Sequence, residues 1–486
     1  MSQLETPSLP FRIRPHPNYA LAVLLVAGFT AITSQIPFQS LLVLIVCRDL
    51  DRERGGTTTV SWTQDLSWED YKSCAQRSDV QATVASWSLW FNLAEDIPAT
   101  IFLIVGGYIV DLVGRKKAMC LSIISMMLQS LSYLSLSVVD VPLILLLPVY
   151  IISGATGGLG IMFLAGSAYI ADTSDPQDRT KYFVLLESVL SVAMCFGPMG
   201  GGYIAKEFGF ATFYSMTASA TLLILGYLVF FFPDSSSQRL PESASKSVKT
   251  IFLDCLTSIS VTLQMVFSFR AATALVAIST LQAFAATGSG LLILQYPMKQ
   301  FGFDAFKTGQ LIFVSSLQRI FILTLVLPTI LSFSKTRGWQ KVNVEIFLLR
   351  FSFFMMTVAQ ICYGLARTEE QFFSSTIPNA ASSVGSPTMR AMLSTLVSPS
   401  FQGRLFSSIS LFERVIALAG TMTTNLIYRS TVESFPQALF FVIAGLLAVG
   451  FVISLLFISK QGVEAMQAAG ETCEEETVTE ETPLLA

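Results

Sequence analysis

Several long apolar segments of this 486-residue chain contain ionisable side chains. The carboxylates inside such segments are Glu95, Asp96, Glu187 and Glu413. The arginines, all in the second half, are Arg319, Arg350, Arg390 and Arg414. Charges in hydrocarbon are costly and therefore functional candidates by default. A carboxyl that alternates between apolar surroundings and a nearby arginine can load and release a proton near neutral pH. The pattern predicts proton-coupling carboxylates and arginines that bind an anionic solute.

The same charged residues have an alternative, purely structural explanation. Four of them lie near the ends of their apolar segments: Glu187, Arg350, Arg390 and Glu413. Long side chains at such depths often reach the membrane surface or form salt bridges between helices. Glu95 and Arg319 are predicted nearer the middle of the membrane. Since neighbours on a helix point about 100° apart, Glu95 and Asp96 cannot both face one cavity squarely.

The elements that position these residues are predicted from composition and length. Hydrophobic residues make up 52% of the chain and charged residues 13%, with a mean hydropathy of +0.62. Soluble domains are roughly 25% charged. Apolar runs of spanning length occur at about 20–46, 83–110, 118–138, 143–170, 183–205 and 211–232, and again at about 272–297, 309–333, 343–365, 371–397, 405–428 and 437–459. We therefore expect an all-α polytopic membrane protein with twelve transmembrane helices in two six-helix bundles.

The expected domain organisation follows from these runs and from the polar stretches between them. We predict a cytosolic N-terminal segment (1–19), an N-terminal bundle (20–232), a cytosolic linker (233–271), a C-terminal bundle (272–459) and an acidic cytosolic tail (460–486). The loop at about 47–80 is expected to face outside or a lumen, because Lys and Arg gather in the connections on the other side. The segments DPQDRTKYFVLLE and SPSFQGRLFSSISLFE resemble each other, as in the internal repeats of transporters.

The sharpest local motif is GYIVDLVGRKK, which begins at Gly107 and is predicted to end the second helix. The small Gly107 permits close helix contact, and Gly114 permits a sharp turn. Asp111 can face a helix N-terminus favourably. The alternative is an ordinary turn whose positive charges, Arg115 and Lys116 among them, orient the chain in the membrane.

This GxxxDxxGRK pattern resembles the loop motif of the major facilitator superfamily, which lies between helices two and three. The resemblance implies a transporter that works by alternating access between two bundles. It also implies that Asp111 lies against the start of the eleventh helix. Arg115 would pair with the acidic residue that ends the fourth helix, here Asp172. Together with Lys116, these residues would latch the halves in the outward-open state.

A second element resembles the core GPxxGG of the family's antiporter motif. It lies in the fifth predicted helix and includes Gly197, Pro198, Gly201 and Gly202. The match is partial, because Val184 and Ala193 stand where the fuller motif has glycine. The alternative is a glycine-rich packing face with a proline kink.

Other chemistries lack the residues that they need. Seven cysteines and one histidine show no metal-ligand spacing, so no metal site and no cofactor are expected. Cys47 and Cys74 bracket the long polar loop and could form a disulfide if that loop faces an oxidising compartment; otherwise they are packing residues. A net charge of −3 argues against nucleic acid as a partner, and the absence of a Walker A pattern argues against ATP.

We therefore expect a secondary active transporter, and not an enzyme, that moves a small organic solute across the lipid bilayer with protons. Proton-coupled export is favoured because the chain resembles fungal efflux-type facilitators. The alternative is proton-coupled uptake of an organic anion, since the chain also resembles the proton-coupled folate transporter branch. A receptor or scaffold on the same fold is a distant alternative. We expect a monomer with cytosolic termini, at the plasma membrane or, since the C-terminal ExxxLL resembles a sorting signal, at a vacuolar or endosomal membrane.

Overall fold

The computed structural model describes residues 15–54, 68–174, 179–234, 267–268, 270–394 and 402–465. Within these ranges the regular secondary structure is helical, as expected for the all-α fold. The first half contains α1 (Pro17–Glu53), α2 (Trp68–Gln76), α3 (Ser78–Val113), α4 (Arg115–Val138), η1 (Leu143–Leu145), α5 (Leu146–Ala155), α6 (Gly158–Thr173), α7 (Arg179–Phe208) and α8 (Phe210–Phe230). The second half contains α10 (Arg270–Phe301), α11 (Ala305–Phe321), η3 (Ile322–Val326), α12 (Leu327–Thr336), α13 (Lys341–Leu365), α14 (Glu369–Ser374), α15 (Thr376–Ala381), η4 (Ser382–Val384), α16 (Gly385–Ser394), α17 (Gln402–Thr431) and α18 (Ala438–Phe457).

Eight helical segments in the described ranges are long and apolar enough to cross a membrane. They are Pro17–Glu53, Arg115–Val138, Leu143–Ile170, Phe210–Phe230, Arg270–Phe301, Ala305–Thr336, Lys341–Leu365 and Ala438–Phe457. The other four predicted spans coincide with α3, α7, the α14–α16 series and α17. The order of helices is therefore consistent with six spans in each half.

Three of the predicted spans are interrupted in the structure, although the sequence predicted a single apolar run for each. The fourth breaks between α5 and α6, where Gly157 and Gly158 have φ values of 73° and 45°, which glycine adopts without steric cost. The eighth contains the π-helix η3 between α11 and α12. The tenth consists of α14, α15, η4 and α16 in series.

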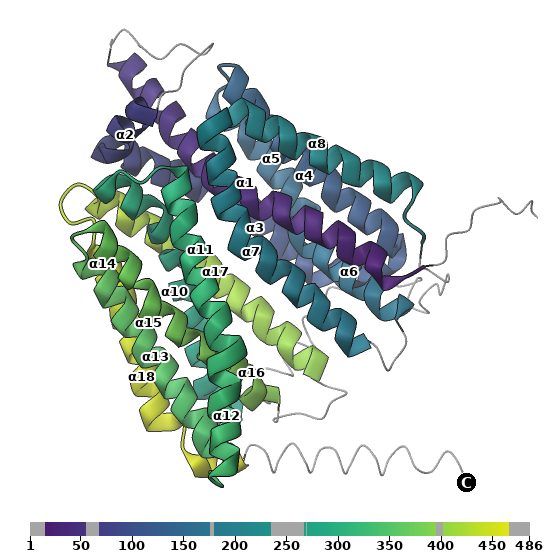
Figure 1. Ribbon diagram of the computed structural model, residues 1–486, viewed down its shortest axis with the longest axis vertical. Coiled ribbons are helices and arrows are strands. Elements are labelled where there is room, and N and C mark those ends of the chain that lie inside the picture. The colour runs from purple at the N-terminus through teal and green to yellow at the C-terminus, as the bar shows by residue number, and fades with distance from the viewer. Residues whose placement is uncertain are drawn as a thin grey trace, which may run out of the picture.

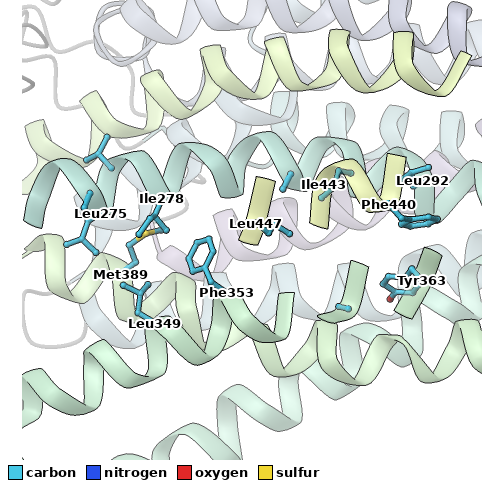
Figure 2. Packing of buried hydrophobic residues seen from close by; sticks show 14 of the residues in the cluster. Leu275, Ile278, Leu292, Leu349, Phe353, Tyr363, Met389, Phe440, Ile443 and Leu447 are labelled. Atoms are coloured by element: carbon cyan, nitrogen blue, oxygen red, sulfur yellow. The ribbon is translucent and has the colours of Figure 1, made fainter. Parts of the chain in front are cut away.

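The two halves lie side by side, with the first half in purple to teal and the second in green to yellow (Figure 1). Helix α7 of the first half packs along α11 of the second, and α3 packs along α17. Each half has its own buried cluster. Figure 2 shows the second-half cluster, in which Leu275 and Ile278 of α10 lie near Leu349 of α13 and Met389 of α16, and Phe353 lies near Leu447 of α18. Such packing contacts hold helices together where lipid replaces water.

One end of the molecule carries α2 and the connection between α10 and α11; we call it the α2 end (Figure 1). Here Cys47 and Cys74 are joined as a disulfide with their Cα atoms 5.7 Å apart. Arg77 forms ion pairs with Asp51 at 2.6 Å and with Asp79 at 2.8 Å. The hydrogen bond from Arg77 is the main reason why the pKa of Asp79 is lowered to about 2. This end is therefore tied by one covalent bond and by charge pairs.

Candidate functional site

A cavity of about 680 Å³ lies between the two halves. Its walls come from α1, α3, α4 and α5 in the first half and from α10, α11 and α17 in the second, with single residues from other helices. Uncharged polar side chains from both halves line it, among them Gln35, Gln39, Asn92, Gln129 and Asn425. A polar cavity at the interface of two helical bundles is the expected place for a solute site in a transporter.

Aromatic rings of the first half form one wall of the cavity. Phe38 stacks on Tyr133 with ring centroids 4.4 Å apart, and Phe91 stacks on Tyr150 at 5.0 Å. The hydroxyls of Tyr133 and Tyr150 are hydrogen-bonded to each other at 2.7 Å. The wall therefore presents apolar ring faces, because its two phenolic hydroxyls already have a partner.

Glu95 lies on the cavity side of α3, against α5. Ser153 Oγ donates a hydrogen bond to Glu95 Oε1 at 2.9 Å, and Gln129 Nε2 donates to the same oxygen at 3.5 Å. A Cβ on Gly154 would collide with the carbonyl oxygen of Glu95. The glycine thus allows α5 to approach α3 closely enough for Ser153 to reach the carboxylate.

Asp96 borders the same cavity and points toward the other half of the molecule. Its Oδ1 lies 3.6 Å from a terminal nitrogen of Arg414 on α17, with the two side chains 33% and 49% exposed. The two neighbouring carboxylates therefore both line the cavity, Glu95 toward α5 and Asp96 toward α17. This arrangement agrees with the expectation that the two carboxylates point in different directions from the helix, although both line the same cavity.

The other predicted arginines lie in different surroundings. Arg319 is exposed on α11, one turn beyond Ser315 and Ser316, which line the cavity; it has no ion-pair partner among the described residues. Arg350 instead donates to the carbonyls of Ser454 at 3.4 Å and Ile458 at 3.0 Å, at the end of α18. These donors face backbone carbonyls that the helix leaves unpaired, and the role of Arg350 as a solute ligand stays a prediction.

Three further charged candidates are not among the described residues that line the cavity. Arg390 is exposed near the end of α16. Glu413 is half-buried on α17, near Ser279 of α10 and Arg390 of α16. The Glu187 side chain lies outside what the structure describes. Their proposed roles stay predictions.

The glycine-rich stretch of α7 lies where three helices meet. Cβ atoms on Gly197 and Gly201 would press against Thr33 of α1, and one on Gly202 would collide with the backbone of Ala305 on α11. Pro198 lies inside α7, and a Cβ on Gly309 of α11 would collide with the carbonyl oxygen of Pro198. The small residues thus bring the two halves into backbone contact; the kink at Pro198 stays a prediction.

Further contacts join the halves at the α2 end. Lys206 of α7 forms an ion pair with Asp304 at 2.6 Å, and the Asp304 side chain also accepts a hydrogen bond from the Lys307 backbone, which caps α11. Tyr71 of α2 is buried and donates to the carbonyl of Phe303 at 3.3 Å. The α2 end is therefore closed in this structure.

The predicted latch residues lie at the opposite end. Arg115 Nε is 3.2 Å from Asp172 Oδ2, and Lys116 donates to the carbonyl of Phe232 at 2.9 Å. Gly114, with φ of 97°, makes the turn between α3 and α4. The surroundings of Gly107 and the side chain of Asp111 lie outside the described residues, so the contact of Asp111 with the eleventh helix stays a prediction.

Sequence reasoning missed most of the uncharged lining. Gln35 and Gln39 lie one turn apart in the first apolar run, and Asn92 lies one turn before Asp96. Polar residues repeated at helical spacing inside an apolar run are a usable signal for a cavity face. The aromatic wall has no such signal, because rings pack against lipid, protein or solute alike.

The chain matches the family model of the Major Facilitator Superfamily over residues 75–367. It belongs to that superfamily. Family membership, the helical fold and the transporter relatives make it a multi-pass membrane transporter and not an enzyme.

Some curated relatives are named for the organic solutes that they carry. The lysosomal proton-coupled steroid conjugate and bile acid symporter of Mus musculus is 26% identical over 458 residues, covering 89% of this chain and 93% of that protein. The proton-coupled folate transporter of Rattus norvegicus is 24% identical, over 76% of this chain and 78% of that protein. The MFS-type transporter avaJ of Aspergillus versicolor is 22% identical, over 72% of each chain. The relatives thus include both branches that the sequence resembles.

Solved structures confirm the fold. The human organic anion transporter TETRAN matches with a TM-score of 0.57 at 16% identity, over 91% of this chain and 100% of that one. A peptide transporter bound to sulfate matches with a TM-score of 0.60 at 14% identity, over 90% and 93%. At such identities the likeness concerns the architecture alone.

Proposed function

We propose that this protein is a proton-coupled symporter that carries a small organic anion from an acidic compartment to the cytosol. The observation that carries the proposal is the arrangement of charges at the central cavity. Two carboxylates on one helix, Glu95 and Asp96, border the cavity, and Arg414 of the opposite half contacts the second of them. Carboxylates that can take up protons beside a cation that can attract an anion are the groups that such coupling needs.

The orientation in the membrane is inferred from charge and from the disulfide. The end opposite α2 carries Arg115, Lys116 and Lys117, which the positive-inside rule assigns to the cytosol. The α2 end carries the Cys47–Cys74 disulfide, a bond that persists in oxidising compartments. We therefore place the α2 end in a lumen or outside the cell.

Uptake into the cytosol is favoured over the export that the sequence alone suggested. Several relatives are named as proton-coupled, and the mouse protein is named as a lysosomal symporter. By contrast, the glycine-rich stretch that resembled an antiporter motif has a packing explanation, since Gly201 and Gly202 allow α7 to meet α1 and α11. By analogy with the mouse protein we propose steroid conjugates and bile acids as the first solutes to test, and an endosomal, lysosomal or vacuolar membrane as the location.

Export stays a second candidate, because the fungal transporter avaJ and the class C tetracycline resistance protein of Escherichia coli are also relatives. The class C protein is 23% identical over 58% of this chain. In that case the same carboxylates would bind protons entering the cytosol while the solute moves outward. The two directions differ in where the solute collects.

The test is a mass-spectrometric panel of steroid sulfates, bile acids and folates in cells that express the protein at the plasma membrane. External pH is set to about 5.5 or about 7.5, a range over which proton coupling changes the driving force. Asp111→Asn serves as the inactive control, since the resemblance makes Asp111 part of the latch. Greater accumulation inside at acidic pH supports symport. Depletion inside with enrichment outside would instead establish export, and no flux in either direction would favour a scaffold.

A further inference from the structure

We propose that Asp96 and the anionic group of the solute bind Arg414 in turn, so that protonation of Asp96 releases the guanidinium to the solute. The inference rests on the proposed function and deepens it, because it names the cationic ligand of the solute and the carboxylate that competes for it. The competition itself would couple the proton to the anion.

The geometry of the Asp96–Arg414 ion pair fits an exchange of partners. The distance of 3.6 Å between Asp96 and Arg414 is longer than a charge-assisted hydrogen bond, which is about 2.7–2.9 Å. Both side chains are partly exposed. The ion pair at the α2 end differs, since Lys206 and Asp304 are 2.6 Å apart and Asp304 is 17% exposed. Asp96 lines the cavity, and a partly exposed ion pair can give up one partner to a dissolved anion at smaller cost than a tight, buried one.

The charges around Asp96 favour an anion only after protonation. Glu95 lies beside it on α3, Arg414 faces it from α17 with Glu413 next in sequence, and Tyr133 and Tyr150 of α4 and α5 lie near Glu95. No lysine or arginine is among the described residues that line the cavity itself, and Arg414 adjoins it through its contact with Asp96. With both carboxylates ionised, an arriving anion meets two negative charges and one arginine that is already paired.

Protonation of Asp96 changes this balance. It removes one negative charge and frees the Arg414 guanidinium, whose planar donors suit sulfate, sulfonate or carboxylate groups. Because Asp96 belongs to the first half and Arg414 to the second, the exchange also removes a contact between the halves at the level of the cavity. On the neutral side Asp96 loses its proton, regains Arg414 and displaces the solute. Proton binding therefore strengthens solute binding, and solute binding strengthens proton binding by the same factor.

The experiment measures equilibrium binding of radiolabelled taurocholate to the purified full-length protein at about pH 5.0 and about pH 7.5. The sulfonate of taurocholate stays ionised at both values, so pH acts on the protein alone. Asp96→Asn, which imitates the protonated carboxyl, is expected to bind about tenfold more tightly than the unmodified protein at the higher pH, the size of one charge-assisted hydrogen bond. Its affinity should no longer depend on pH.

Companion variants complete the design. Arg414→Gln should lose binding at both pH values, and Arg414→Lys should retain part of it, since an ammonium keeps the charge without the planar donors. Asp96→Glu should keep the pH dependence. Arg429→Gln, an exposed change at the far end of the same helix, is the matched control and should bind as the unmodified protein does.

The inference is overturned if Asp96→Asn keeps the full pH dependence or if Arg414→Gln binds normally. It also falls if Glu95→Gln alone removes the pH dependence, a result that would leave proton-coupled symport intact. Failure of the proposed function looks different: the unmodified protein would then show no acid-stimulated flux of taurocholate or estrone sulfate in proteoliposomes. Elution as a single species in size-exclusion chromatography identifies variants that fold, and Asp96→Glu and Arg414→Lys carry the test if the larger changes do not.

Discussion

The two halves of the molecule meet in two unlike ways, at the α2 end and around the central cavity. At the α2 end, glycines bring α7 and α11 into backbone contact and the Lys206–Asp304 pair is tight. Around the cavity, the ion pair between the halves is the longer, partly exposed Asp96–Arg414 contact. Backbone contacts cannot adjust to a small change, whereas an exposed ion pair can exchange partners. The α2 end therefore acts as the closed gate in this state, and the cavity is the place where ligands change the balance.

The largest effect on transport is expected from placing a side chain where the backbones of α7 and α11 meet. A leucine at Gly202 has no room against Ala305, so Gly202→Leu should prevent closure of the α2 end and lower transport by about twentyfold or more. Gly200→Leu is the matched control, because a Cβ there meets nothing within 4 Å. Flux in proteoliposomes checks the pair. Equal losses in both variants would mean that general damage to α7, and not the contact between halves, explains the result.

A smaller effect is expected when the cavity loses a titratable group. Glu95→Gln keeps the shape and the hydrogen bonds to Ser153 and Gln129 within reach, but it cannot exchange a proton. Transport should fall by about tenfold, the size of one hydrogen bond to a charged group, while the remaining flux should still be higher at acidic than at neutral pH, because Asp96 keeps its carboxyl. Glu433→Gln, in an exposed connection, is the control. Loss of the pH dependence in Glu95→Gln would instead make Glu95, and not Asp96, the coupling carboxylate.

The tight ion pair at the gate should matter less than the backbone contact beside it. Asp304→Asn removes the charge but keeps a side chain that caps α11, and should lower transport about threefold. Asp304→Ala loses both the ion pair and the cap, so a further loss of thermal stability is expected. Transport and melting temperature of the two variants separate these contributions. If Asp304→Asn has no effect at all, the glycines alone close the gate.

The disulfide should affect stability more than flux. It closes a stretch of 27 residues, for which the chain-entropy estimate is about 3.5 kcal/mol. Cys47→Ser/Cys74→Ser should therefore lower the melting temperature by several degrees while transport stays near the original rate. Thermal unfolding in detergent checks this, with Cys195→Ser as the control for a buried free thiol. A loss of transport without a loss of stability would place the disulfide in the gate itself.

The smallest effect concerns pH at the α2 end. The pKa of Asp79 is about 2, lowered chiefly by Arg77, so its ion pairs contribute stability above the unfolded pKa of about 3.9 and lose it only as pH falls toward 2. Between about pH 7.5 and pH 5.0, Asp79→Asn should thus lower the melting temperature by the same small amount. A difference that shrinks at pH 5.0 would show that the α2 end, as well as the cavity, responds to lumenal acid.

Much of the fold was predictable, because spanning helices must be apolar over a fixed length and the chain keeps that length in nearly every run. Glu95, Asp96 and Arg414 could be found for a related reason: a charge inside such a run stands out. The contacts of Arg350 could not be predicted, since sequence does not show that the end of α18 lies across from it. Sequence also could not show that Glu95 faces α5 and Asp96 faces α17, because this depends on which helices flank α3.

The π-helix at Ile322–Val326 has a consequence for comparing this protein with its relatives. Each π-turn holds one residue more than an α-turn, because its hydrogen bonds run from residue i to i+5. Such a turn accommodates one additional residue, so beyond it the sequence register differs by one residue from that of a regular helix, which corresponds to about 100° around the axis. An ungapped alignment across this segment would therefore match α12 to the wrong face of a relative whose helix is regular. Positions before Ile322, Arg319 among them, would be compared correctly, and those from Leu327 onward would need a one-residue gap.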